Sequence, residues 1–502
     1  MSSTSPSVGM RGRVLRGVGW KAMSQLVFQA SRIAVAVILA RLLSPHDYGL
    51  AGMVMVVGLF ALVFSDLAFG AAIVQRAHLT EDDRSTVFWA SIAAGVFFTS
   101  AGIALAGPLA AFYGEPEVRP LFAALSVSFL ITSIGSIQTA LLTREMEFRR
   151  LEIRQIAATL CGAIVGISLA FGGAGAWAII GQQLTVAVVS SALVWLLVDW
   201  KPMFRFSGES IRRLGGFSSK VFGQRLLYYA SRSADGILIG RFLGATAVGI
   251  YAVAYNVILI PFSQIAGPIQ QVMFPAFARM QEDLDRVAAV WIRTMRLIAA
   301  VTMPALLGMI VVAPDFVSVI LGDKWSAAVP VLRILAFVAI LQSLQTMNAD
   351  ILQALDKAGT MLRFMIVWFA ANLTAFVIGL QWGIVGVASA YAVAAAFLEP
   401  ANAWLTTRAL GTSLSSVVRG ISGVAQAAVG MALIVAGARQ LALELSISPL
   451  LRLVALIGLG VVVYLPLCAW RSPAARRDVL ELIRRSKTTS LSEPQPLSEP
   501  QL

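Results

Sequence analysis

Charged residues, histidine and cysteine are scarce in this chain of 502 residues. Only 13% of the positions are charged, and there are two histidines and two cysteines. Cys161 and Cys468 fall in separate apolar segments, so neither a disulfide framework nor a metal site is supported. The phosphate-binding pattern G-x-x-x-x-G-K-S/T is also missing, which argues against ATP hydrolysis by this chain. We therefore expect no enzyme, no metal and no organic cofactor.

Hydrophobic residues are abundant instead. They make up 58% of the chain, and the mean hydropathy is +0.80, whereas about a quarter of the residues in soluble domains are charged. A transmembrane helix needs about 20 apolar residues. About fourteen such runs predict an all-α polytopic membrane protein. The predicted spans are 18–43, 48–74, 86–112, 118–142, 153–171, 175–198, 214–242, 247–274, 294–321, 329–355, 361–380, 384–406, 417–438 and 451–470.

Lysines and arginines gather in alternate loops, and their placement predicts the topology. With a cytoplasmic N-terminus, 29 of the 39 basic residues are cytoplasmic and six lie at the outer side, as the positive-inside rule requires. Both termini are then cytoplasmic, and His46 and His78 fall on opposite sides, so they cannot share a metal. The net charge of +13 is explained without a nucleic-acid partner. The four remaining basic residues lie within predicted spans: Arg32, Arg225, Arg232 and Arg333.

Two apolar segments 200 residues apart carry the same polar residues. Ala30-Ser31-Arg32 recurs as Ala230-Ser231-Arg232, and Arg41 and Gly49 recur as Arg241 and Gly249. Apolar sequence seldom repeats two arginines at the same spacing by chance. Weaker matches continue along the chain, including Gly114 with Gly322 and Gly172 with Gly383. The sequence therefore predicts an internal duplication of about six helices.

An even number of spans in each copy predicts a parallel repeat, related by an axis along the membrane normal, which is a transporter arrangement. The predicted parts are a basic N-terminus (1–17), an N-lobe (18–198), a cytoplasmic linker (199–213), a C-lobe (214–406), two extra helices (417–470) and a basic, then disordered, tail (471–502). Two such lobes leave a central cleft that alternating access would open to each side. The alternative is that duplication records only the origin of the chain.

Polar residues follow one face of the first helix and of the seventh. Lys21, Gln25, Gln29 and Arg32 recur at helical spacing, as do Arg225, Arg232 and Asp235. An unpaired arginine within the bilayer costs about 2.5 to 3.5 kcal/mol on insertion scales, so both faces are expected to meet protein or a watery cavity. Paired guanidinium groups on two walls would favour a phosphate-bearing ligand.

Structural explanations compete with this interpretation. Arg232 and Asp235 are one turn apart and would also form an ion pair, and Arg225 is close enough to the inner surface to extend toward water. Arg32 has no acidic neighbour within a turn or two. Arg41 and Arg241, at the outer helix ends, favour an anchoring role. With Gly49 and Gly249 they mark the repeat.

Four carboxylates within predicted spans are candidates for ion coupling: Asp66, Asp235, Asp350 and Glu399. Each would take up a proton or a sodium ion if a cation gradient drives transport. Glu399 precedes Pro400, where a kink would free backbone carbonyls. The sequence does not distinguish among the four.

Several motifs together resemble a known family. Residues 40–50 (ARLLSPHDYGL), 64–67 (FSDL), 72–76 (AIVQR), 111–114 (AFYG) and 239–244 (IGRFLG) resemble the bacterial lipopolysaccharide and exopolysaccharide flippases. These form the polysaccharide transport branch of the multidrug/oligosaccharidyl-lipid/polysaccharide exporter superfamily, and colanic-acid-exporter-like members are similar. The resemblance runs from about residue 11 to residue 470.

This resemblance implies a flippase of the bacterial inner membrane that moves a polyprenyl-diphosphate-linked oligosaccharide between leaflets. It implies a cationic cavity with Arg32, Arg225 and Arg232, proton or sodium coupling in which Asp235 takes part, and a polymerase and glycosyltransferases as partners. One alternative is a drug or cation exporter of the same superfamily, which would prefer acidic and aromatic cavity groups. The other is a membrane polysaccharide polymerase, which would need a sizeable outer loop.

Overall fold

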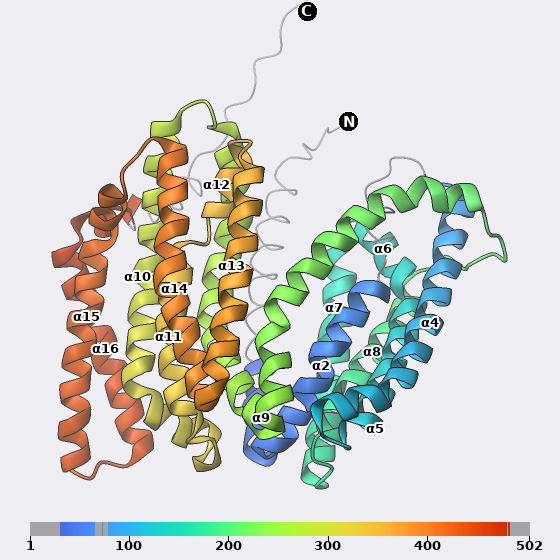
Figure 1. The fold of residues 1–502 in the computed structure, drawn as a ribbon, viewed down its shortest axis with the longest axis horizontal. Helices are drawn as coiled ribbons and strands as arrows, with labels where there is room; N and C mark the ends of the chain where they lie inside the picture. The colour runs from blue at the N-terminus through green and yellow to red at the C-terminus, as the bar shows by residue number, and fades with distance from the viewer. Residues whose placement is uncertain (1–30, 66–72, 74–78, 479, 482–502) are drawn as a thin grey trace, which may run out of the picture. The chain divides into compact units, whose positions relative to one another are not determined.

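A computed structural model describes residues 31–65, 73, 79–478 and 480–481 of the chain (Figure 1). These residues form helices joined by short connections, and no strand occurs among them. Two compact units can be distinguished, Met1–Ala252 and Val253–Leu502. The division falls inside one long helix and not in the predicted linker at 199–213, so the predicted lobe boundaries remain predictions.

Six helices and the start of a seventh build the first unit, together with a helical segment at 31–42. In Figure 1, α4 lies beside α5, and α7 beside α8, while α2 packs on α5. The bounds are α2 (Pro45–Ser65), α4 (Glu81–Tyr113), α5 (Val118–Ile134), α6 (Ser136–Arg144), α7 (Phe148–Phe171), α8 (Trp177–Leu197) and α9 (Gly208–Arg279).

Helix α4 begins five residues before the span predicted from hydropathy because a capping box extends it. Thr80 accepts from the Asp83 backbone N–H at 3.1 Å, and Asp83 accepts from the Thr80 N–H at 3.2 Å. These two bonds satisfy donors that the first turn of a helix leaves free. The helix ends at Gly114, whose φ of 73° suits glycine.

The fourth predicted span is broken into α5 and α6, which are bent by 44° at Gly135. The bend is held by side chains of α8. Ser191 Oγ donates to the Ile131 carbonyl at 2.7 Å, and Trp195 Nε1 donates to the Ile134 carbonyl at 3.0 Å. Carbonyls that lose helical partners at a bend must be satisfied elsewhere, and here another helix supplies the donors.

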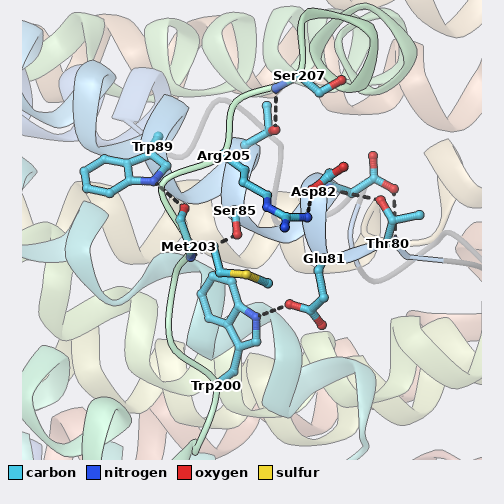
Figure 2. A network of polar contacts seen from close by, with 11 residues as sticks. Thr80, Glu81, Asp82, Ser85, Trp89, Trp200, Met203, Arg205 and Ser207 are labelled. Atoms are coloured by element: carbon cyan, nitrogen blue, oxygen red, sulfur yellow. Dashed lines mark hydrogen bonds and ion pairs between the residues drawn. The ribbon is translucent and has the colours of Figure 1, made fainter.

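The connector between α8 and α9 runs along the first turns of α4 (Figure 2). Trp89 Nε1 donates to the Met203 carbonyl at 2.9 Å, and the Met203 N–H donates to Ser85 Oγ at 3.2 Å. Trp200 Nε1 donates to Glu81 Oε2 at 2.8 Å, and the Trp89 ring stacks on Phe204. The connector is therefore bound to α4 by both backbone and side-chain groups.

Gly244 interrupts α9 between the two spans predicted at 214–242 and 247–274. Its φ of 82° and ψ of 177° are accessible to glycine and strained for other residues. The Ala245 N–H, which begins the following helical segment, donates to Glu115 Oε1 at 3.4 Å. The break falls between the two predicted spans, so α9 consists of two helical segments that meet at Gly244.

The second unit contains the end of α9 and the remaining helices. Figure 1 shows α10 beside α11 and α15, and α13 beside α14. The bounds are α10 (Leu284–Phe316), η1 (Val317–Leu321), η2 (Asp323–Trp325), α11 (Ala328–Leu344), α12 (Asn348–Ala354), α13 (Ala358–Gly379), η3 (Leu380–Trp382), α14 (Gly383–Leu410), α15 (Leu414–Glu444) and α16 (Pro449–Arg471).

Two prolines inside α10 each leave a carbonyl four residues earlier without its helical donor. Side chains of other helices replace both donors. Tyr464 of α16 donates through its hydroxyl to the Ala300 carbonyl at 2.7 Å, opposite Pro304. Arg333 of α11 donates through Nε to the Ile310 carbonyl at 3.0 Å, opposite Pro314. The intramembrane arginine Arg333 thus has a structural role.

Ion pairs fasten α15, α16 and the segment that follows α16 to two places along α10. At one end Asp315, with 1% of its side chain exposed, accepts from Arg439 Nε at 2.5 Å and from Arg452 Nε at 2.6 Å. More than three turns into α10 from its start, Arg296 pairs with Asp478, beyond α16, at 2.7 Å. The two helices without a counterpart in the first copy are therefore held firmly on α10.

The predicted spans agree well with the helices of the described residues. Nine helices there are long and apolar enough to cross a membrane, or up to ten with the bent pair α5 and α6. Parts of the first two predicted spans lie outside the described residues, so the total of about fourteen remains a prediction. The chain is a multi-pass helical membrane protein.

Candidate functional site

Arg32 is the second residue of the described helical segment at 31–42. Leu39 and Leu43, which follow on the same face, are buried in a cluster with Ala170, Ala178 and Ile179 of the α7–α8 region. Arg32 continues this core-facing stripe, yet its side chain is exposed. The face that packs against protein at Leu39 is thus uncovered at the level of Arg32. Gln25 and Gln29, predicted on the same face, lie outside the described residues.

The second predicted cationic face belongs to α9. The helix is continuous at Arg225 and Arg232, and both positions precede the break at Gly244, but the described structure does not extend to their side chains. Asp235 is half-buried, and its Oδ1 accepts the Gly236 backbone N–H at 2.8 Å. The ion pair between Arg232 and Asp235 therefore remains a prediction.

The duplicated glycines lie at a close crossing of α2 and α9. A Cβ atom added to Gly49 would lie 1.7 Å from the Ala245 carbonyl oxygen, and one added to Gly249 would lie 1.9 Å from that of Pro45. Real Cβ atoms essentially never come closer than 3.0 Å to such atoms. The two contacts are equivalent under the repeat, because Gly49 and Gly249 are 200 residues apart in the sequence, and so are Pro45 and Ala245.

Aromatic groups surround Arg241 near this crossing. Its guanidinium carbon lies 5.6 Å from the Phe112 ring centre and 5.8 Å from that of Phe242, within cation–π range. Gly240 packs against the Tyr113 ring. These contacts agree with an anchoring role for Arg241, while Arg41 is exposed.

Glu399 and Asp350 occupy polar surroundings in the second unit. Glu399, with 4% of its surface exposed, accepts from Trp368 Nε1 at 3.5 Å. The Oδ1 atoms of Asn372 and Asn402 are buried and find no donor among the described residues. Asp350 accepts from the side chain of Gln270, but its Oδ2 is buried and also finds no donor there. Asp66 lies outside the described residues.

Sequence reasoning missed Asp315, which also lies within a predicted span. It binds Arg439 and Arg452, 124 and 137 positions further along the chain, so no local pattern reveals the pairing. The available signal was the presence of two arginines at outer helix ends with no counterparts in the first copy. No cluster of three metal-ligating side chains occurs in the described part of the chain.

The helices, their lengths and the duplicated crossing define a multi-pass, all-helical membrane fold. The fold is similar to that of the lipid II flippase MurJ in an inward closed conformation, with a TM-score of 0.72. The match covers 91% of this chain and 99% of that one at 13% sequence identity. At this identity the likeness shows the fold alone.

Within that class, the chain belongs to the polysaccharide biosynthesis protein family, whose sequence profile matches residues 38–330. It is 26% identical to the lipopolysaccharide biosynthesis protein WzxC of Escherichia coli, over 76% of this chain and 78% of that protein. It is 27% identical to the teichuronic acid biosynthesis protein TuaB of Bacillus subtilis, over 94% of this chain and 99% of that protein.

Proposed function

We propose that this protein is a flippase that moves a polyprenyl-diphosphate-linked oligosaccharide across the bacterial inner membrane by alternating access, for surface polysaccharide synthesis. Family membership supports the pathway, since the relatives are named for lipopolysaccharide and teichuronic acid biosynthesis. The fold of a lipid II flippase supports the type of movement. Glycosyltransferases and a polymerase are the expected partners, and both termini are expected in the cytoplasm.

The observation that carries the proposal at residue level is the exposed Arg32, on the helix face that is buried further along at Leu39 and Leu43. A guanidinium at this position would be costly in lipid and favourable in a watery cavity beside an anion. Its forked donors match the oxygens of a diphosphate. Arg32 and Arg232 would then hold the head group, with Arg225, Gln25 and Gln29 beside it, while the polyprenyl chain remains in lipid.

Replacement of these arginines in a strain lacking the gene tests the proposal. Arg32→Ala and Arg232→Ala are expected to abolish or strongly reduce surface polysaccharide at equal membrane abundance, and Arg32→Lys to retain part of the output. Arg333→Ala is the matched control, because that intramembrane arginine binds a backbone carbonyl. Normal polymer output from both alanine variants would refute the assignment.

We further propose that a proton or a sodium ion drives the cycle, with Glu399 as the first carboxylate to test and Asp235, Asp350 and Asp66 as the others. The burial of Glu399 and its contact with Trp368 support this choice, as does the buried, unsatisfied Oδ1 of Asn402 three residues further along α14. Pro400 also removes a backbone donor from the same turn. Glu399→Gln is expected to slow translocation in vesicles with an imposed cation gradient, and unchanged gradient dependence would contradict the role.

The alternatives give different results in the same strain. A drug or cation exporter would change susceptibility to a panel of toxic cations and leave the polysaccharide intact. A polymerase would need an outer domain, whereas the described connections predicted on that side are short, at 114–117, 172–176 and 445–448. The short connections favour transport over polymerisation.

A further inference from the structure

A cavity of about 390 Å³ lies inside the first unit, among α2, α5, α6, α7 and α8. This volume is within the range of about 300 to 1,000 Å³ typical of small-molecule sites. Arg154 of α7 and Thr139 of α6 line it, as do Leu125 and Phe129 of α5 and Val186 of α8. The cavity is partly open to the surroundings, so it is accessible from outside the bundle.

Arg154 brings a positive charge to this cavity, and none of the carboxylates in the described part of the chain forms an ion pair with it. Its Nη1 donates to Thr139 Oγ1 at 2.7 Å, while its Nε is buried and finds no acceptor among the described residues. Thr139 in turn donates to the Gly135 carbonyl at 2.8 Å. An arginine side chain has five N–H donors, and a buried charge that is not compensated is costly. The site therefore favours an anion with several acceptor oxygens.

The polar and apolar groups of the cavity are separated along the helices. The start of α7 lies beside the end of α8, because Arg150 Nη1 reaches the Leu197 carbonyl at 3.4 Å. Arg154 is one turn further into the bundle from this end, which the charge pattern predicts to be cytoplasmic. Val186 and Leu125 lie further from that end. An occupant would thus place its anionic group toward the cytoplasm and its apolar part toward the middle of the membrane.

We infer that this cavity binds an anionic lipid from the cytoplasmic leaflet, with the lipid phosphate on Arg154 and an acyl or prenyl chain along Leu125, Phe129 and Val186. The bidentate fit of guanidinium to phosphate oxygens supports the choice of head group, and the apolar lining supports the choice of a lipid over a soluble anion. The inference concerns the interior of one unit and does not depend on the proposed transport function.

The test uses the purified full-length protein in detergent, with lipids added one at a time. The probes are phosphatidylglycerol, a polyprenyl monophosphate, zwitterionic phosphatidylcholine and uncharged diacylglycerol. Bound lipid is counted by native mass spectrometry, and stability is followed by thermal unfolding. One or both anionic lipids are expected to stay bound to the protein and to raise its unfolding temperature. The anionic lipid that binds more tightly identifies the source of the phosphate.

Three variants separate the site from general surface attraction. Arg154→Gln removes the charge and is expected to weaken binding about tenfold or more, as for the loss of a charge-assisted hydrogen bond. Ala187→Leu narrows the cavity without changing the charge and is expected to weaken binding as well. Arg150→Gln, one turn earlier on α7 and exposed, removes an equal charge and is expected to bind as the native protein does.

Two results would overturn the inference. The first is that Arg154→Gln and Ala187→Leu both retain each anionic lipid, phosphatidylglycerol and polyprenyl monophosphate, as well as the native protein does. The other is equal binding of diacylglycerol and the anionic lipids by the native protein, which would show that the phosphate is not recognised.

Discussion

Replacement of Asp315 by asparagine is expected to destabilise the second unit more than any other single ion-pair change in the described structure. Only 1% of the Asp315 side chain is exposed, against 16% for Arg439 and 11% for Arg452. Asparagine would leave two guanidinium groups largely buried without a negative charge. Loss of one partner from a buried ion pair costs about 3 to 5 kcal/mol, so the expected loss is at least of this size.

The ion-pair cluster around Arg293 and Arg296, within the first half of α10, gives the comparison. Arg293 is 34% exposed there and Glu481 is 52% exposed, so water and salt weaken that pair, which is expected to contribute about 1 kcal/mol or less. Thermal unfolding of purified Asp315→Asn and Glu481→Gln proteins should therefore show a large and a small decrease in midpoint, respectively.

A triple variant distinguishes lost pairing from lost packing. Replacing Asp315, Arg439 and Arg452 together with leucine or methionine removes all three charges, and apolar replacement of a buried ionic cluster is often close to neutral. The triple variant should unfold nearer to the native protein than Asp315→Asn does. An equal or larger loss in the triple variant, or no loss in Asp315→Asn, would refute the reasoning.

Three further predictions concern helix contacts and use the same unfolding measurement. Gly249→Ala forces a Cβ atom against the Pro45 carbonyl and should lower the free energy of unfolding by about 1 to 3 kcal/mol or more. The control is Gly107→Ala, whose Cβ atom meets open space, and this variant should be neutral or mildly stabilising. Tyr464→Phe leaves the Ala300 carbonyl without its donor and should cost about 1 to 3 kcal/mol; an unchanged midpoint would show that water replaces the hydroxyl. Arg205→Ala breaks an ion pair with Asp82 in which both side chains are more than half exposed, so no measurable effect is expected, and a clear loss would contradict this account of the connector.

Hydropathy predicted the helices well because the bilayer fixes the length of apolar sequence that a span requires. The helix ends and bends were harder to predict. The start of α4 depends on the bonds between Thr80 and Asp83. The bend at Gly135 depends on donors from α8, which lie about 60 residues away in sequence. Such contacts between distant residues leave no periodic signal in either helix.

The candidate site was predictable only in part. The sequence identified Arg32 as an unusual intramembrane arginine, and the structure adds that it extends a core-facing stripe yet is exposed. Arg333 belonged to the same set, but it binds the carbonyl freed by Pro314. Arg154, at the start of the predicted span 153–171, is one of the 29 basic residues that the topology explains as cytoplasmic, and the sequence does not reveal the cavity that five helices form around it. Composition alone therefore does not separate structural from ligand-binding arginines.

The reciprocal crossing of α2 and α9 also bears on the ancestry of the chain. Gly49 meets the carbonyl of Ala245, and Gly249 meets that of Pro45, so the same surface is used twice with the roles exchanged. This is the contact pattern of an isologous interface in a two-fold symmetric homodimer. If the predicted duplication arose by gene fusion, the crossing would have joined two copies of one ancestral subunit before the fusion. A close contact through glycine, once required in each separate subunit, would then have been retained at both positions of the fused chain.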